Sequence, residues 1–161
     1  MANYEQRLTE LGLVLPAPMQ RPAGLVLRFP WVSVRGERCF VSGHSPLNPD
    51  GSMAGPFGIV GEDVTIEQAQ ESARKTALSV LSSLKRELGD LDRIVAWCRV
   101  FGMVNCAPRF GQTPLVINGF SEVILDVFGP EVGRHARSAI GVAGLPFNFP
   151  VGVEAEVLIA T

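Results

Sequence analysis

The sequence predicts one α+β domain in which two long helices cover one face of a mixed β-sheet. Its length of 161 residues is typical of a single domain, and β-favouring segments alternate with helical ones along the chain. The hydrophobic content of 47% and the mean hydropathy of +0.23 are high for a small monomer. With both helices on one face, the other face of the sheet is left for a partner chain, which favours an oligomer.

The first 24 residues are predicted to form an extension in front of the sheet, within a single domain that spans 1–161. Residues 4–11 have the pattern of a short helix that ends at Gly12. Prolines then follow at short intervals and predict an extended arm.

Two strands joined by a turn are predicted next. β-favouring residues occupy 25–29 and 31–34, with Pro30 between these pieces, and 38–42 returns as a second strand. Residues 45–61 are rich in proline and glycine and are predicted to form a long loop. Loops longer than roughly 12 to 15 residues are often functional.

The clearest element is a long helix that begins after Thr65 and stops at Gly89. Thr65 is a favourable N-cap, Gln68 stands at the capping-box spacing, and glycine is a common helix stop. Apolar residues recur at three- and four-residue steps and form one stripe. The stripe consists of Ile66, Ala69, Ala73, Ala77, Val80, Leu84 and Leu88. Its small alanines predict close packing on the sheet.

The second half of the chain is predicted to add three strands and one more helix. Residues 94–104 have the composition of a strand. Thr113, which proline follows, is predicted to be the N-cap of the second long helix, and Gly129, also followed by proline, is predicted to end it. Final strands at 136–142 and 151–159 complete the order β-β-α-β-α-β-β.

The composition argues against several classes of partner. The formal net charge is -2 and the basic residues are scattered, whereas a nucleic-acid-binding surface normally shows a basic stripe, so no nucleic-acid partner is expected. Three cysteines without a CxxC pair argue against a disulfide framework and a zinc knuckle. The amino terminus is not a signal peptide and no apolar run approaches the length of a bilayer span. A cytoplasmic protein with no membrane partner is expected.

The familiar motifs of metal and cofactor chemistry are missing from the sequence. There is no HExxH, no P-loop, no GxGxxG after a strand and no GxSxG elbow. Neither histidine is accompanied by a carboxylate cluster, so no metal site is expected. The sequence therefore predicts no cofactor.

Three polar residues are candidates for a site. His44 follows a strand directly after Gly43, where the backbone can approach a ligand closely. His135 lies two residues before Arg137, and Arg137 opens an otherwise apolar strand. A guanidinium offers a planar fork for a carboxylate. The ordinary alternatives are an unremarkable surface histidine and an arginine paired with an acid.

Five segments, in order and at compatible spacing, resemble the RidA/YjgF family of reactive-intermediate deaminases. They are the strand end Phe40-Val41-Ser42-Gly43-His44, the loop 46–51, the long alanine-striped helix, Ile117-Asn118-Gly119-Phe120, and the carboxy-terminal run 136–155. The resemblance covers nearly all of the chain from about residue 25.

The resemblance implies a chorismate mutase-like α+β fold and a homotrimer whose sheets form an inner barrel. It implies clefts between subunits that hydrolyse enamines and imines to ketoacid and ammonia without a cofactor. Arg137 would hold the carboxylate of a small acid, and the other substrate-binding positions of the cleft are Asn118, Ser42, Gly43 and Phe29. The family also carries an older endoribonuclease label, against which the acidic pI of about 5.7 argues.

The chain departs from the active deaminases of this family at four positions. Ala139 replaces a cysteine, Gly152 replaces a glutamate, Phe29 replaces a tyrosine and His44 replaces a glutamine. Two interpretations are open: either His44 takes over proton transfer, because its ordinary pKa lies near neutrality, or the cleft binds a small carboxylate without turnover. The aromatic segment 146–150 predicts a more apolar pocket. The short front helix has no counterpart in the pattern, and both packing over the cleft and packing on a neighbour are open for it.

Overall fold

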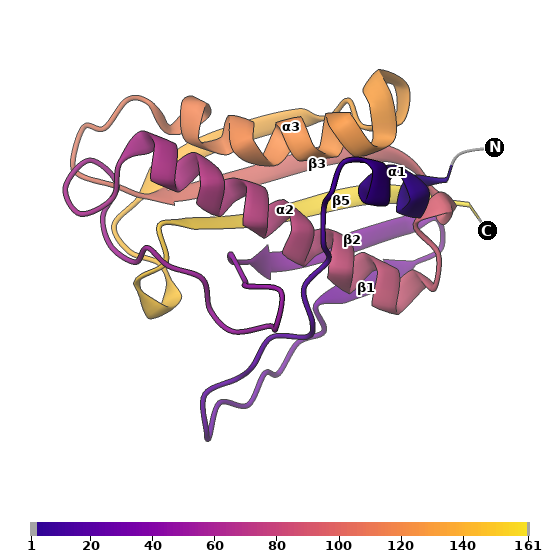
Figure 1. The fold of residues 1–161 in the computed structure, drawn as a ribbon, viewed down its shortest axis with the longest axis horizontal. Coiled ribbons are helices and arrows are strands. Elements are labelled where there is room, and N and C mark those ends of the chain that lie inside the picture. The colour runs from indigo at the N-terminus through magenta and orange to yellow at the C-terminus, as the bar shows by residue number, and fades with distance from the viewer. Residues whose placement is uncertain (1–2, 161) are drawn as a thin grey trace.

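A five-stranded mixed sheet with all long helices on one side forms the body of the molecule (Figure 1), in a computed structural model that describes residues 3–160. The strands are β1 (Val32–Arg35), β2 (Arg38–His44), β3 (Ile94–Asn105), β4 (Ala136–Val142) and β5 (Val151–Ile159). Their order across the sheet is β1-β2-β5-β3-β4. Only β3 and β4 pair in parallel, and the other neighbours are antiparallel. The predicted α+β class with a mixed sheet is confirmed.

The first long helix, α2 (Ile66–Leu88), forms as the sequence predicts. The Thr65 hydroxyl accepts a hydrogen bond from the amide of Gln68 at 3.1 Å, and the Gln68 side chain accepts one from the amide of Thr65 at 2.9 Å. Gly89 follows the helix with φ of 81°, a conformation that glycine adopts at little cost. The apolar stripe faces the core, so this helix is positioned by its own sequence pattern and by burial together.

Thr65→Ala is expected to lower the free energy of unfolding by about 1 kcal/mol, because it leaves one amide of the first turn without its cap. Urea unfolding followed by circular dichroism measures the difference. Thr65→Ser keeps the accepting oxygen and is expected to stay close to the wild type. Equal stability of the alanine variant and the wild type would mean that solvent replaces the cap fully.

The second long helix, α3 (Thr113–Val132), differs from its prediction at both ends. Thr113 is the first helical residue and not the N-cap; Gln112 precedes the helix and makes no side-chain capping bond. The Thr113 hydroxyl instead donates to the carbonyl of Ala139 at 3.0 Å and ties the helix to β4. At the other end Gly129 interrupts the helix with φ of 72°, but a last turn continues to Val132. The sequence predicted the interruption and not the turn beyond it.

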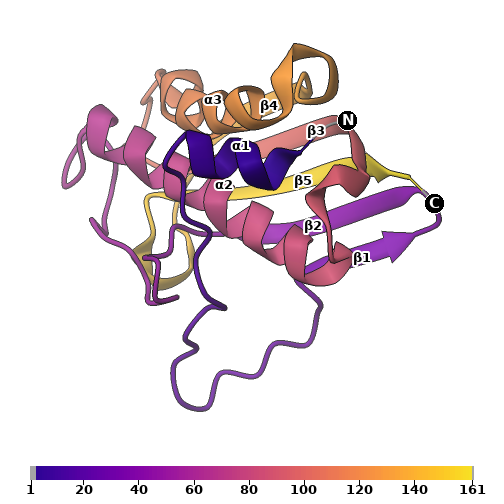
Figure 2. The same ribbon diagram turned by 45° about the vertical axis from the view of Figure 1, so that its right-hand side comes forward.

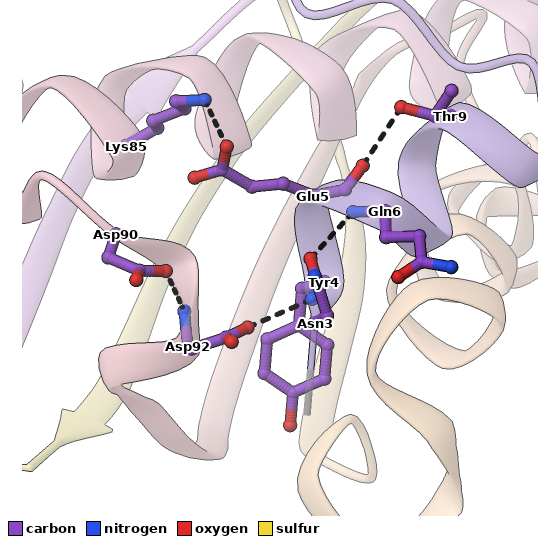
Figure 3. Close-up of polar contacts among 8 residues, drawn as sticks. All are labelled: Asn3, Tyr4, Glu5, Gln6, Thr9, Lys85, Asp90 and Asp92. Atoms are coloured by element: carbon purple, nitrogen blue, oxygen red, sulfur yellow. Dashed lines mark hydrogen bonds and ion pairs between the residues drawn. The ribbon is translucent and has the colours of Figure 1, made fainter. Parts of the chain in front are cut away.

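The front helix, α1 (Tyr4–Glu10), packs on the helices of its own chain (Figure 3). The amide of Tyr4 donates to the Asp92 carboxylate at 2.9 Å, and Glu5 forms an ion pair with Lys85 of α2. The Tyr4 ring lies 4.3 Å from the ring of Phe128 in α3. α1 therefore covers the helical layer of its own chain, which is neither of the two placements that the sequence left open.

Between α1 and β1 the chain forms an irregular arm that projects beyond the body (Figures 1 and 2). The prediction of a strand at 25–29 is wrong, because this segment pairs with no strand of the sheet. β-favouring side chains alone do not make a strand without a ladder partner.

The core lies between the sheet and the two long helices. Trp97 of β3 packs edge-on against Phe120 and Phe128 of α3, with ring centroids 6.2 and 5.6 Å apart. Within residues 3–160 no helix lies over the opposite face of the sheet, which carries apolar Phe40 and Ile140, 38% and 41% exposed. The prediction that a partner chain covers this face stays a prediction.

Candidate functional site

The residues predicted for the site fall into two groups on different parts of the sheet. Arg137 and Asn118 lie at the β4 edge, whereas Gly43 and His44 lie at the end of β2. Two strands, β5 and β3, separate β2 from β4 (Figure 2). With an inter-strand spacing of about 4.8 Å, the two groups lie about 14 Å apart across the sheet. One chain therefore does not bring them together.

At the β4 edge, Arg137 is held by neutral acceptors of α3. Its Nη1 donates to Asn118 Oδ1 at 3.0 Å and to Ser121 Oγ at 3.1 Å, and its Nη2 donates to the carbonyl of Pro114 at 3.3 Å. Within residues 3–160 no carboxylate lies within 4.0 Å of its nitrogens. Desolvation lowers the pKa of Arg137, which stays cationic at neutral pH. Arg137 therefore does not form the ion pair with an acid of residues 3–160 that was the ordinary alternative.

His135 stands beside this arginine, connected through Ser121. Ser121 Oγ lies 2.9 Å from His135 Nε2, and His135 Nδ1 donates to the carbonyl of Gly133 at 2.7 Å. Burial lowers the pKa of His135, and the charge of Arg137 lowers it further. The sequence indicates His135 and Arg137 as candidates at the two-residue spacing of one side of a strand, but it does not predict that Ser121 connects them.

The second group borders a cavity of about 300 Å³ between α2, the arm and the end of β2. Its walls are mostly apolar, and the apolar residues come from four parts of the chain. They are Met19, Leu25, Leu27 and Phe29 of the arm, Trp31 before β1, Leu47 of the long loop, and Pro146, Phe147 and Phe149. The aromatic segment 146–150 thus lines an apolar pocket, as its composition predicted.

His44 lies at the inner side of this cavity and is only 5% exposed. Its Nδ1 donates to the carbonyl of Ser42 at 2.6 Å, and its Nε2 accepts from Ser83 Oγ, 2.8 Å away on α2. Desolvation lowers the pKa of His44 to about 4, and the nearby charge of Arg86 adds to the effect. The imidazole is therefore neutral at pH 7. Burial therefore removes the near-neutral titration from which proton transfer was expected, and the role of His44 in proton transfer stays a prediction.

Ser42 and Gly43 form an irregularity in the sheet at this point. The pairing of β2 with β5 shifts between Val41 and His44, and such bulges are frequent beside functional sites. Gly43 has open space where a side chain would stand, so a ligand can approach its backbone. The Ser42 hydroxyl donates to the carbonyl of Pro30 at 2.8 Å and does not line the cavity.

Two of the four positions that depart from the deaminase pattern, Gly152 and Ala139, carry no proton-transfer group. Gly152 is buried on β5 opposite Met103, and Ala139 lies on β4 beside the Thr113 side chain.

Across the described part of the chain, no three His, Cys, Asp or Glu side chains group closely enough to hold a metal ion. Over the same residues, no helix has the length and apolarity to cross a membrane.

Comparison with known proteins places the chain among relatives that match almost all of its length. Residues 5–154 match the model of the family described as YjgF/chorismate mutase-like, putative endoribonuclease. Protein TCP17 of Trypanosoma cruzi is 41% identical over 150 residues, which cover 93% of this chain and 90% of that protein.

Two solved structures resemble the chain closely over its whole length. The protein Atu1372 of Agrobacterium tumefaciens, of unknown function, is 38% identical with a TM-score of 0.86, covering 98% of this chain and 92% of that one. A putative endoribonuclease of Shewanella oneidensis is 27% identical with a TM-score of 0.87, covering 98% and 99%.

Proposed function

Because the chain belongs to the YjgF/chorismate mutase-like family, we propose that it hydrolyses enamine or imine intermediates to a ketoacid and ammonia. One observation carries the proposal. The guanidinium of Arg137 is held by Asn118, Ser121 and a backbone carbonyl, and no described carboxylate neutralises it. An oriented, uncompensated guanidinium is suited to a substrate carboxylate.

The proposed site forms between subunits of a homotrimer whose sheets face an inner barrel. Arg137 and Asn118 would come from one subunit, and Phe29, Gly43 and His44 from its neighbour, because these groups lie about 14 Å apart within one chain. The edge strand β4 and the helix-free face of the sheet offer the contact surface. We propose no nucleic-acid or membrane partner, and the three free cysteines fit a cytoplasmic location.

The chemistry proceeds by addition of water to a C=N bond. The substrate carboxylate forms a bidentate ion pair with Arg137, which fixes the imine carbon relative to a water molecule. The water oxygen bonds to that carbon, one water proton passes to the nitrogen, and the carbinolamine then collapses to ketoacid and ammonia. Neutral His44, with Nε2 as acceptor, is the proposed carrier of the proton, and it must exchange its bond to Ser83 for one to water.

Arg137→Met is expected to lower kcat/KM for a freshly generated 2-imino acid by about 100-fold or more, since loss of a charged hydrogen-bond partner typically costs about 2 to 5 kcal/mol. Release of ammonia and ketoacid measures turnover. Arg134→Met, at an exposed arginine just before β4, is the matched control and should retain full activity. Unchanged turnover in Arg137→Met would overturn the proposal.

A second candidate function is a binding module for a small carboxylate without turnover. Gly152 and Ala139 favour it, because a glutamate and a cysteine of the deaminase pattern are replaced there by residues without proton-transfer groups. Calorimetry with 2-oxobutyrate separates the two functions. Arg137-dependent binding by a wild-type protein that does not turn over imines would establish the second.

A further inference from the structure

We propose that the apolar cavity beside α2 is a binding site for a monocarboxylic acid with a bulky apolar body, and that Arg86 anchors its carboxylate. The inference uses a different anchor from the proposed hydrolase, namely Arg86 of α2 in place of Arg137 of β4. It shares Phe29, Gly43 and His44 at the cavity with that proposal, but it needs only one chain.

The polar end of the cavity is built by one face of α2. Ser79, Ser82, Ser83 and Arg86 all line it, and their three-, four- and seven-residue spacing from Ser79 places them on one side of a helix. The three serines are buried, between 2% and 5% exposed. Each of the three serines is hydrogen-bonded within the protein, and Ser79 Oγ donates to the carbonyl of Lys75 at 3.1 Å, so together they form a fixed polar surface at one end of the apolar cavity.

Two of these serines hold the guanidinium of Arg86. Nη1 donates to Ser82 Oγ at 2.5 Å, and Nη2 donates to Ser83 Oγ at 2.9 Å. Ser82 in turn donates to the carbonyl of Pro16 in the arm at 2.6 Å, and Ser83 faces His44 Nε2. The serines therefore fix the guanidinium and leave three of its five N–H groups for another acceptor.

Arg86 has no counter-ion within the part of the chain that the structure describes. No carboxylate of residues 3–160 lies within 4.0 Å of its nitrogens, and Glu5 is engaged by the neighbouring Lys85. His44 beside it is neutral, and partial desolvation lowers the pKa of Arg86 without discharging it. Arg86 is itself exposed, so solvent stabilises its charge while the cavity is empty, and its fixed guanidinium at the edge of the cavity can receive an anion that brings its own apolar surface.

The residues that line the cavity indicate the charge and the apolar body of the ligand. Arg86 is the single charged residue among those that line the cavity, which fits one negative charge and argues against phosphates and dicarboxylates. No carboxylate lines the cavity to receive an ammonium group, which argues against amino acids. The volume of about 300 Å³ and the rings of Trp31, Phe147 and Phe149 suit an aryl or branched aliphatic acid.

Titration with 3-phenylpropionate tests the proposal, with calorimetry and the fluorescence of Trp31 as readouts. We expect the wild type to bind it, Arg86→Met to weaken binding at least tenfold, and Arg86→Lys to lie between them. The amide 3-phenylpropanamide, which lacks the charge, should bind the wild type as weakly as the acid binds Arg86→Met. Leu27→Trp, which reduces the volume of the cavity and leaves Arg86 in place, should also weaken binding.

Arg137→Met is the control that separates this inference from the proposed hydrolase. It should bind 3-phenylpropionate like the wild type, even where imine turnover is lost. No binding to the wild type, equal binding of acid and amide, unchanged affinity in Arg86→Met with its fold intact by circular dichroism, or equal losses in Arg86→Met and Arg137→Met would each overturn the inference.

Discussion

Gly119→Ala is expected to lower the free energy of unfolding by about 3 kcal/mol or more, a large share of the stability of a domain of this size. A Cβ atom at Gly119 of α3 would overlap the carbonyl oxygen of Gln70 on α2 and lie 3.0 Å from its carbonyl carbon. Both atoms belong to helix backbone, so only a separation of the two helices relieves the overlap. Alanine would gain about 1 kcal/mol of helix propensity, which does not offset this cost.

The same substitution is expected to disturb the anion site, because Asn118 and Ser121 flank Gly119 and orient Arg137. Urea unfolding gives the stability, and binding of 2-oxobutyrate reports on the site. Gly111→Ala, just before α3, is the matched control, since nothing lies within 4 Å of the added carbon. A Gly119→Ala protein as stable as Gly111→Ala would show that the helix contact is loose.

The contrast between α2 and the arm shows what the sequence can predict about this fold. In α2 the N-terminal capping box, the apolar stripe and the glycine stop all predict the same helix. Each of these features lies within one segment of the sequence. Residues 25–29 have strand composition, but a strand exists only where a partner offers its backbone, and no local pattern supplies one. The predicted start of α3 is wrong for a related reason. The Thr113 hydroxyl donates a hydrogen bond to β4 and does not cap its own helix.

For the site, the sequence identified single residues and missed the groups that they form. The sequence indicates Arg137, Asn118 and His135 as candidates and the structure joins them, whereas Ser121, which connects His135 to Arg137, has no signal in the sequence. Burial of His44 depends on α2 lying over the end of β2, which no segment reveals alone. Ser79, Ser82, Ser83 and Arg86 share one face of α2, but the apolar stripe alone accounts for the helix, so the sequence does not reveal that this face borders a cavity.

The protein is expected to lose about 3 kcal/mol of stability from His44 alone as the pH falls from 7 to 4. Burial holds the folded-state pKa of His44 at about 4, below its ordinary value of 6.5. Between these values the unfolded chain binds a proton that the folded protein does not, so the contribution is complete above pH 6.5 and is lost as the pH falls toward 4. A difference of roughly 2.5 pH units at about 1.4 kcal/mol per unit corresponds to about 3 kcal/mol.

His44→Gln isolates this contribution, because carboxylates of both proteins titrate alike in the same range. Glutamine keeps a hydrogen-bonding amide toward Ser42 and Ser83 and carries no charge at any pH. We expect urea unfolding between pH 7 and pH 4.5 to show a shallower loss in the variant, and His135→Gln, at a half-buried site, to change the slope less. Parallel curves for His44→Gln and the wild type would mean that burial does not hold the folded-state pKa of His44 below its ordinary value.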